Sequence, residues 1–271
     1  MIARLLTIAL LTGIAAAAAV PADAQGSAPA PTPGLQISVE PLSVEFALAP
    51  GAQADTPVTI RNVGTQSAVI VITPLDWRSS LDGTVKTERP GAEGPASLSQ
   101  YLQISGAEAT LAPGETKHFT LALALPATFS AVPRDLRGGY LVRAVPANAN
   151  RTTAFGVGAN ILVYEMVGAP DRRLKLTDLH VVDDGNHSAR LVARLQNEGR
   201  TFIRPQLHIL LAQAGRVVIS KDDTTPAVLG GEPRRLERSF GQLPSGVYQL
   251  QLTVDYGGAT LVRGTTEFTV R

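Results

Sequence analysis

The chain has 271 residues, with 24 Lys and Arg against 23 Asp and Glu, and it contains no cysteine. A formal net charge of +1 without any block of Lys or Arg leaves no electrostatic footprint for nucleic acid, so we expect no nucleic-acid partner. Because disulfide bonds are excluded, hydrophobic cores must stabilise the fold.

The first 24 residues have the pattern of a secretion signal. Arg4 carries a positive charge, residues 5–20 are almost wholly apolar, and Ala22-Asp23-Ala24 has the small-x-small form of a cleavage site. We therefore expect a signal peptide over residues 1–24 and a mature chain that begins near Gln25. An N-terminal membrane anchor is the alternative, whereas a lipid anchor would need a cysteine.

The remaining sequence favours an exported, soluble protein. After residue 24 no stretch approaches the ~20 uninterrupted apolar residues of a membrane helix, so we expect no stable membrane insertion. The composition, rich in Ala and Arg and poor in Lys, suggests a bacterium of high genomic GC content. Together these features predict a location in the bacterial periplasm.

Alternation of apolar and polar residues dominates the chain beyond the Pro/Ala linker expected over residues 25–34. Residues 118–125 place Phe119, Leu121, Leu123 and Leu125 on one face, and residues 247–256 place Tyr248, Leu250, Leu252, Val254 and Tyr256 on one face. Such runs are typical of half-buried antiparallel strands. The 25 glycines and 19 prolines fit strands separated by turns, and no segment has a helical period. The predicted fold class is all-β.

One order of motifs occurs twice. Asn62-x-Gly64 is followed by Leu111-x-Pro-Gly-Glu115, and Asn197-x-Gly199 is followed by Leu229-Gly-Gly-Glu232, each with strand patterns around it. A repeat of ~100 residues made of short strands indicates tandem immunoglobulin-like β-sandwiches. We expect the first over residues 35–167, with a hairpin inserted around residues 76–105, and the second over residues 171–271.

No group of residues has the spacing of a catalytic or metal site. The histidines are scattered and form no metal-ligand pair: His118, His180, His187 and His208. There is no G-x-S-x-G elbow, and residues 156–158 lack the third glycine and the helix of a phosphate loop. The acidic run at residues 183–186 reads as a turn rather than a calcium loop. We therefore predict no enzyme activity, no catalytic residue, no metal site and no cofactor.

The residues from Ile37 to about Val167 resemble a known family. The matching motifs are Val39-x-Pro41, Val44-x-Phe46, Pro50-Gly51, residues 59–62, Leu111-x-Pro113-Gly114-Glu115, Phe119-x-Leu121, Gly139-Tyr140 and residues 160–164. In this order they resemble the N-terminal immunoglobulin-like domain of periplasmic pilus-assembly chaperones. The hairpin with Asp76-Trp77 and Asp82-Gly83 is also similar to exported immunoglobulin-like domains of WxL-associated peptidoglycan-binding proteins.

The chaperone resemblance implies a partner-binding strand. In that family an exported subunit adds a strand to the last strand of the first domain, and two basic residues bind its terminal carboxylate. Residues 160–166 and 42–46 of this chain contain no Lys or Arg, so anchoring of that kind is not expected. The resemblance places the edge-strand site at Asn160, Ile161, Leu162, Val163 and Tyr164. The alternative is that Ile161 and Val163 are simply core residues.

Two functions therefore follow as expectations. The first is a non-enzymatic, chaperone-like adaptor that binds an exported polypeptide, pilin-like or another surface protein, in pilus or surface-structure assembly. The alternative is a cell-envelope module that binds peptidoglycan or glycan through the inserted hairpin, with Trp77 and Asp82 as its recognition surface. Aromatic residues make up only 5% of the chain, which disfavours an extended platform for stacking sugars.

Overall fold

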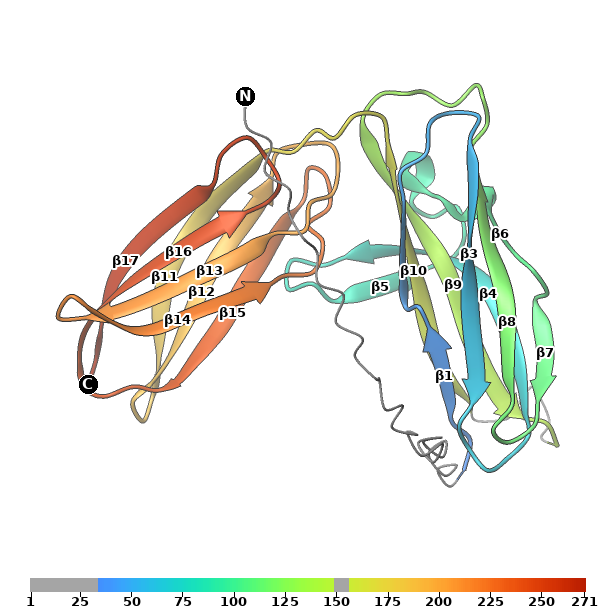
Figure 1. Cartoon of the computed structure of the whole chain (residues 1–271), viewed down its shortest axis with the longest axis horizontal. Coiled ribbons are helices and arrows are strands. Elements are labelled where there is room, and N and C mark those ends of the chain that lie inside the picture. Colours follow the sequence, from blue (N-terminus) through green and yellow to red (C-terminus); the bar gives the residue numbers. More distant parts are fainter. Residues whose placement is uncertain (1–33, 149–155) are drawn as a thin grey trace, which may run out of the picture. The chain divides into compact units, whose positions relative to one another are not determined.

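The computed structural model describes residues 34–148 and 156–271, and Figure 1 shows its strands in chain order. The signal peptide expected at residues 1–24 and residues 25–33 of the expected linker lie outside the described residues. Within the described part, regular structure consists of strands and two short 3₁₀ turns, at Gly94–Ala96 and Ser99–Tyr101, so the predicted all-β class is confirmed. No helix in that part is long and apolar enough to cross a membrane.

The first sandwich contains two sheets. One sheet has the order β1 (Ile37–Glu40), β3 (Gln53–Asn62), β8 (Thr116–Ala124) and β6 (Leu102–Ile104). The other has the order β2 (Ser43–Phe46), β10 (Val157–Val167), β9 (Arg134–Pro146), β4 (Ala68–Ser79) and β5 (Val85–Glu88), with β7 (Glu108–Leu111) paired to β4. The chain therefore passes from one sheet to the other between β1 and β2.

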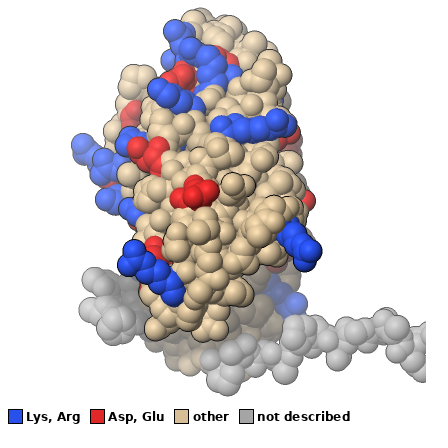
Figure 2. Space-filling model, turned by 90° about the vertical axis from the view of Figure 1, so that its left-hand side faces the viewer, with Lys and Arg blue, Asp and Glu red and all other residues tan. Residues whose placement is uncertain are grey.

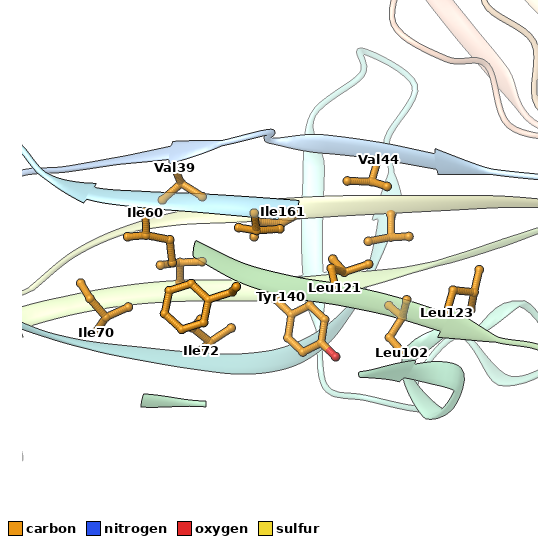
Figure 3. Packing of buried hydrophobic residues seen from close by; sticks show 14 of the residues in the cluster. Val39, Val44, Ile60, Ile70, Ile72, Leu102, Leu121, Leu123, Tyr140 and Ile161 are labelled. Atoms are coloured by element: carbon orange, nitrogen blue, oxygen red, sulfur yellow. The ribbon is translucent and has the colours of Figure 1, made fainter. Parts of the chain in front are cut away.

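The core of the first sandwich lies between these sheets. Figure 3 shows Ile60, Leu121 and Leu123 on the β3–β8 side of the core, together with Ile72, Tyr140 and Ile161 from the other sheet. The alternation predicted for residues 118–125 is present, because Phe119, Leu121, Leu123 and Leu125 are all buried. His118 lies on the opposite, solvent-exposed face, where its Nδ1 atom is 3.1 Å from Thr59 Oγ1.

The second sandwich also contains two sheets. Their orders are β11 (Leu174–Gly185), β12 (Ser188–Asn197), β15 (Pro233–Gln242), and β14 (Arg216–Thr224), β13 (Gln206–Gln213), β16 (Gly246–Asp255), β17 (Val262–Val270). Tyr248, Leu250, Leu252 and Val254 are buried on the inner face of β16, as their alternation predicts. On the face of the molecule shown in Figure 2, basic and acidic side chains are interspersed, and a broad area between them carries neither.

The two Asn-x-Gly motifs make the same corner. Asn62 Nδ2 donates hydrogen bonds to the carbonyls of Gln66 (2.7 Å) and Leu111 (3.1 Å), and its Oδ1 accepts one from the Gly64 amide (3.0 Å). Asn197 does the same with Thr201, Val228 and Gly199, at 2.9, 3.0 and 2.9 Å.

The glycine of each corner is explained by a close backbone approach. A Cβ atom on Gly64 would lie 2.3 Å from the Gly34 carbonyl oxygen, and one on Gly199 would lie 2.0 Å from the Asp171 carbonyl oxygen. Real Cβ atoms do not approach backbone so closely, so a larger residue at either position would have to displace the neighbouring segment. The sequence repeat therefore corresponds to one structural device used twice.

Candidate polypeptide-binding edge

Strand β10 has neighbours of unequal length on its two sides. On one side β9 pairs antiparallel with the whole strand, from Val157 opposite Ala144 to Val167 opposite Arg134. On the other side β2 pairs in parallel only from Leu162 opposite Ser43 to Glu165 opposite Phe46. Among the described residues, the stretch 157–161 therefore has no strand paired with it on the β2 side.

The direction of the backbone groups follows from one hydrogen bond. The Leu162 amide donates to the Leu42 carbonyl at 2.9 Å, so the polar backbone groups of Leu162 face β2. Because these groups alternate in direction along a strand, those of Asn160 and Gly158 face the same way. No strand of the described chain reaches them.

The side chains of the open stretch also alternate. Ile161 is fully buried, Ala159 packs partly against the first core, and Val157 is 37% exposed at the end of the strand. The apolar face of β10 therefore becomes progressively more accessible toward Val157. A strand added here would gain backbone hydrogen bonds on its edge and apolar contacts on its inner face.

The structure divides the five residues of the predicted site into two groups. Leu162, Val163 and Tyr164 already pair with β2, whereas Asn160 and Ile161 lie in the open stretch. Ile161 and Val163 are core residues, as the alternative interpretation expected, and this placement leaves the backbone edge at Asn160 open. The edge-strand site remains a prediction, and the geometry concentrates it on residues 157–161.

Tyr164 and Trp77 belong to a third apolar cluster. This cluster contains Leu75, Trp77, Tyr164, Phe202, Ala227 and Leu229, drawn from both sandwiches. The Tyr164 ring lies 4.8 Å from that of Trp77 and 5.4 Å from that of Phe202. Trp77 is only 1% exposed, and its Nε1 donates to the Gly138 carbonyl at 2.8 Å.

Its burial leaves the indole of Trp77 unavailable to a ligand in this conformation. The predicted hairpin surface therefore keeps only Asp82 as an exposed member, at the turn between β4 and β5. The sequence showed that Trp77 lies in a hairpin, but it did not show that the second sandwich covers that hairpin.

Polar contacts surround the third cluster. Asp135 of β9 accepts hydrogen bonds from the amides of Phe202 (2.5 Å) and Gly230 (2.6 Å). Burial raises the pKa of the Asp135 carboxyl to about 6, although these two amides act in the opposite direction. Arg137, also of β9, forms an ion pair with Glu232 of the second sandwich at 3.0 Å.

A basic side chain does lie beside β2, but it comes from the second sandwich. Arg204 forms an ion pair with Glu45 of β2, and its guanidinium group stands 5.2 Å from the centre of the Tyr164 ring. Arg204 and Glu45 border a pocket of about 290 Å³ that Arg172 also lines. Inspection of the strand sequences alone missed Arg204, because nothing in the local pattern associates it with β2. Its charge is already matched by Glu45.

No three His, Asp or Glu side chains of the described residues lie close enough together to hold a metal ion. The histidine side chains make separate contacts, such as that of His208 Nδ1 with Asp222 Oδ1 at 2.6 Å.

No family model matches the chain, and no curated protein matches its sequence. Solved structures of chaperones align with most of the chain at low sequence identity. The class 5 fimbriae chaperone CfaA is 11% identical, with a TM-score of 0.44, over 85% of this chain and 99% of that one. The CupB2 chaperone of Pseudomonas aeruginosa is 13% identical, with a TM-score of 0.44, over 86% and 100% of the two chains.

Proposed function

We propose that the chain is a non-enzymatic, chaperone-like adaptor of the periplasm that binds an exported polypeptide by strand addition to β10 at residues 157–161. The observation that supports this proposal is the outward direction of the Gly158 and Asn160 backbone groups, which have no strand partner in the described chain. The partner is an extended segment whose alternate side chains are apolar, because Val157 and Ala159 offer an apolar surface beside the edge.

The missing cationic anchor is part of the proposal. Arg204 is paired with Glu45, and β10 itself carries no Lys or Arg. A desolvated carboxylate without a cationic partner is unfavourable by several kcal/mol. We therefore expect amidation of the partner's C-terminus to change its affinity for the β10 edge by less than about twofold.

The test compares two substitutions at one position. Asn160→Pro removes the outward amide hydrogen at an edge where proline is tolerated, so the fold should persist while partner binding falls by about tenfold or more. Asn160→Ala keeps the backbone and should bind like the wild type. The partner is the polypeptide that co-purifies with the protein from periplasm, and affinity is measured with both variants.

Hydrogen exchange supplies the second measurement. Bound partner should protect the amides of Gly158 and Asn160. Protection confined to the β4–β5 hairpin, with residues 157–161 unchanged, would contradict the edge model. Equal binding by the two Asn160 variants would also contradict it.

A further inference from the structure

A second pocket lies where the tip of the β4–β5 hairpin meets β15. It has a volume of about 420 Å³, and its lining includes Asp82, Gly83, Arg234, Arg235, Glu237 and Arg238. The hairpin is held here by backbone contact, since the Arg235 amide donates to the Leu81 carbonyl at 2.7 Å. This pocket is distinct from the β10 edge.

Arg234 is the unusual member of this lining. It is 6% exposed, and its Nη2 group donates to Ser79 Oγ and to the Ala227 carbonyl, both at 2.8 Å. Its Nε atom is buried without a hydrogen-bond partner in the described chain. Its Nη1 group lies against Gly83, where an added Cβ atom would come within 2.0 Å of it. The guanidinium group therefore retains unused donors beside the hairpin.

The other two guanidinium groups are already neutralised. Arg235 Nε is 2.6 Å from Glu237 Oε1, and Arg238 Nε is 2.5 Å from Asp223 Oδ2. Arg234 has no carboxylate within ion-pair distance among the described residues. Burial lowers the pKa of Arg234, as expected for a cation that lacks a close counter-ion.

Asp82, at the hairpin tip, is an acidic residue that lines the same pocket as Arg234. Its Oδ1 atom already accepts hydrogen bonds from Ser80 Oγ (2.5 Å) and the Thr84 amide (3.0 Å). Those bonds lower the pKa of Asp82 to about 2, so the side chain stays charged at neutral pH. Asp82 is therefore fixed to its own turn instead of pairing with Arg234.

We propose that this pocket binds a carboxylate group of a peptide ligand, with Arg234 as its main hydrogen-bond donor. Of the three guanidinium groups in the lining, only that of Arg234 has no carboxylate within ion-pair distance among the described residues. One unmatched guanidinium group suits a monoanion, and the carboxylates of Asp82 and Glu237 oppose a doubly charged phosphate. A guanidinium group binds carboxylates through geometrically matched, charge-assisted hydrogen bonds.

The test is a titration of the purified protein with N-acetylglycine, followed through the backbone amide resonances of Gly83 and Arg235. We expect saturable shifts that are absent with N-acetylglycine amide. Asp82→Asn keeps the Oδ1 acceptor of the turn but removes its charge, so it should tighten binding about two- to threefold. Arg234→Gln should weaken it at least about tenfold. Arg216→Gln removes an exposed charge elsewhere in the second sandwich and should leave binding unchanged.

The opposite results would overturn the proposal. Equal binding of the amide, or affinity that is insensitive to Asp82→Asn, would show that the pocket does not sense carboxylate charge. Saturable binding of inorganic phosphate in place of N-acetylglycine would assign the pocket to a different anion. Arg234→Gln could disturb the contact between the hairpin and the second sandwich. Asp82 is exposed in a turn, so Asp82→Asn leaves that contact intact and still tests whether the pocket senses charge.

Discussion

Asn62 in the first sandwich and Asn197 in the second make the same three hydrogen bonds, although the strands around them differ in number and length. The sandwiches differ most at their edges. The open stretch of β10 in the first, Val157–Ile161, contains no charged residue, whereas the edge strand β14 of the second carries Arg216, Lys221, Asp222 and Asp223.

The two edges differ in how well they are protected against pairing with another chain. Charged side chains on an edge strand discourage pairing with other chains, and β14 has them. The open stretch of β10 lacks that protection. The corner that both sandwiches share is therefore explained by folding, whereas the uncharged edge found at residues 157–161 is what the proposed strand addition would use.

The largest expected effect tests whether each sandwich depends on its own core. Leu252→Asp would place a carboxylate among buried residues of the second core, and Leu121→Asp would do so in the first. Lost packing and the unpaired charge together cost about 5 kcal/mol or more, comparable to the stability of a domain. We expect each variant to lose the dispersed amide resonances of its own sandwich in two-dimensional NMR spectra.

The control lies one residue away. Gln251 is on the opposite face of β16, so Gln251→Lys should change the free energy of unfolding by less than about 0.5 kcal/mol. Wild-type-like melting of Leu252→Asp would show that the inner and outer faces of β16 are reversed.

A smaller effect tests the shared corner. Asn62→Ala and Asn197→Ala would each remove three side-chain hydrogen bonds, at a cost of about 3 kcal/mol. In each case one bonded group keeps a second partner, because the Gly64 amide also donates to Gln36 and the Val228 carbonyl also accepts from Ile203. Both side chains are fully buried, so the two losses should agree within about 1 kcal/mol in denaturant titrations. A large loss at one corner and none at the other would show that the repeat is similar in sequence but not in energetic role.

The sequence predicted these features because they are local. Alternation identified the buried faces of β8 and β16, and the Asn-x-Gly pattern located both corners. Contacts between segments that are distant in the sequence have no corresponding local pattern. Nothing in the local pattern shows that β2 pairs with residues 162–165 of β10, that Arg204 reaches Glu45, or that Trp77 is buried. Local periodicity reports which side chains face inward, but it does not report which other segment lies beside an edge or over an outer face.

The smallest effect concerns a buried carboxyl on β10 of the first sandwich. Glu165 of β10 is fully buried, its Oε1 accepts a hydrogen bond from the Leu48 amide at 2.7 Å, and its Oε2 has no partner in the described chain. Burial raises its pKa from 4.5 to about 7. The folded chain thus binds this proton more tightly than the unfolded chain, and the stabilisation is full below pH 4.5 and lost as pH rises toward 7.

Glu165→Gln keeps the acceptor for Leu48 but cannot ionise. The variant should therefore exceed the wild type in unfolding free energy by about 2 kcal/mol above pH 7, and the difference should vanish near pH 4.5. In the second sandwich, hydrogen bonds from Arg190 lower the pKa of the exposed Asp184, so Asp184→Asn should act with the opposite sign and only weakly. Denaturant titrations from pH 4.5 to 8 measure both. A Glu165→Gln advantage that is constant across this range would arise from packing, and it would remove ionisation as the cause.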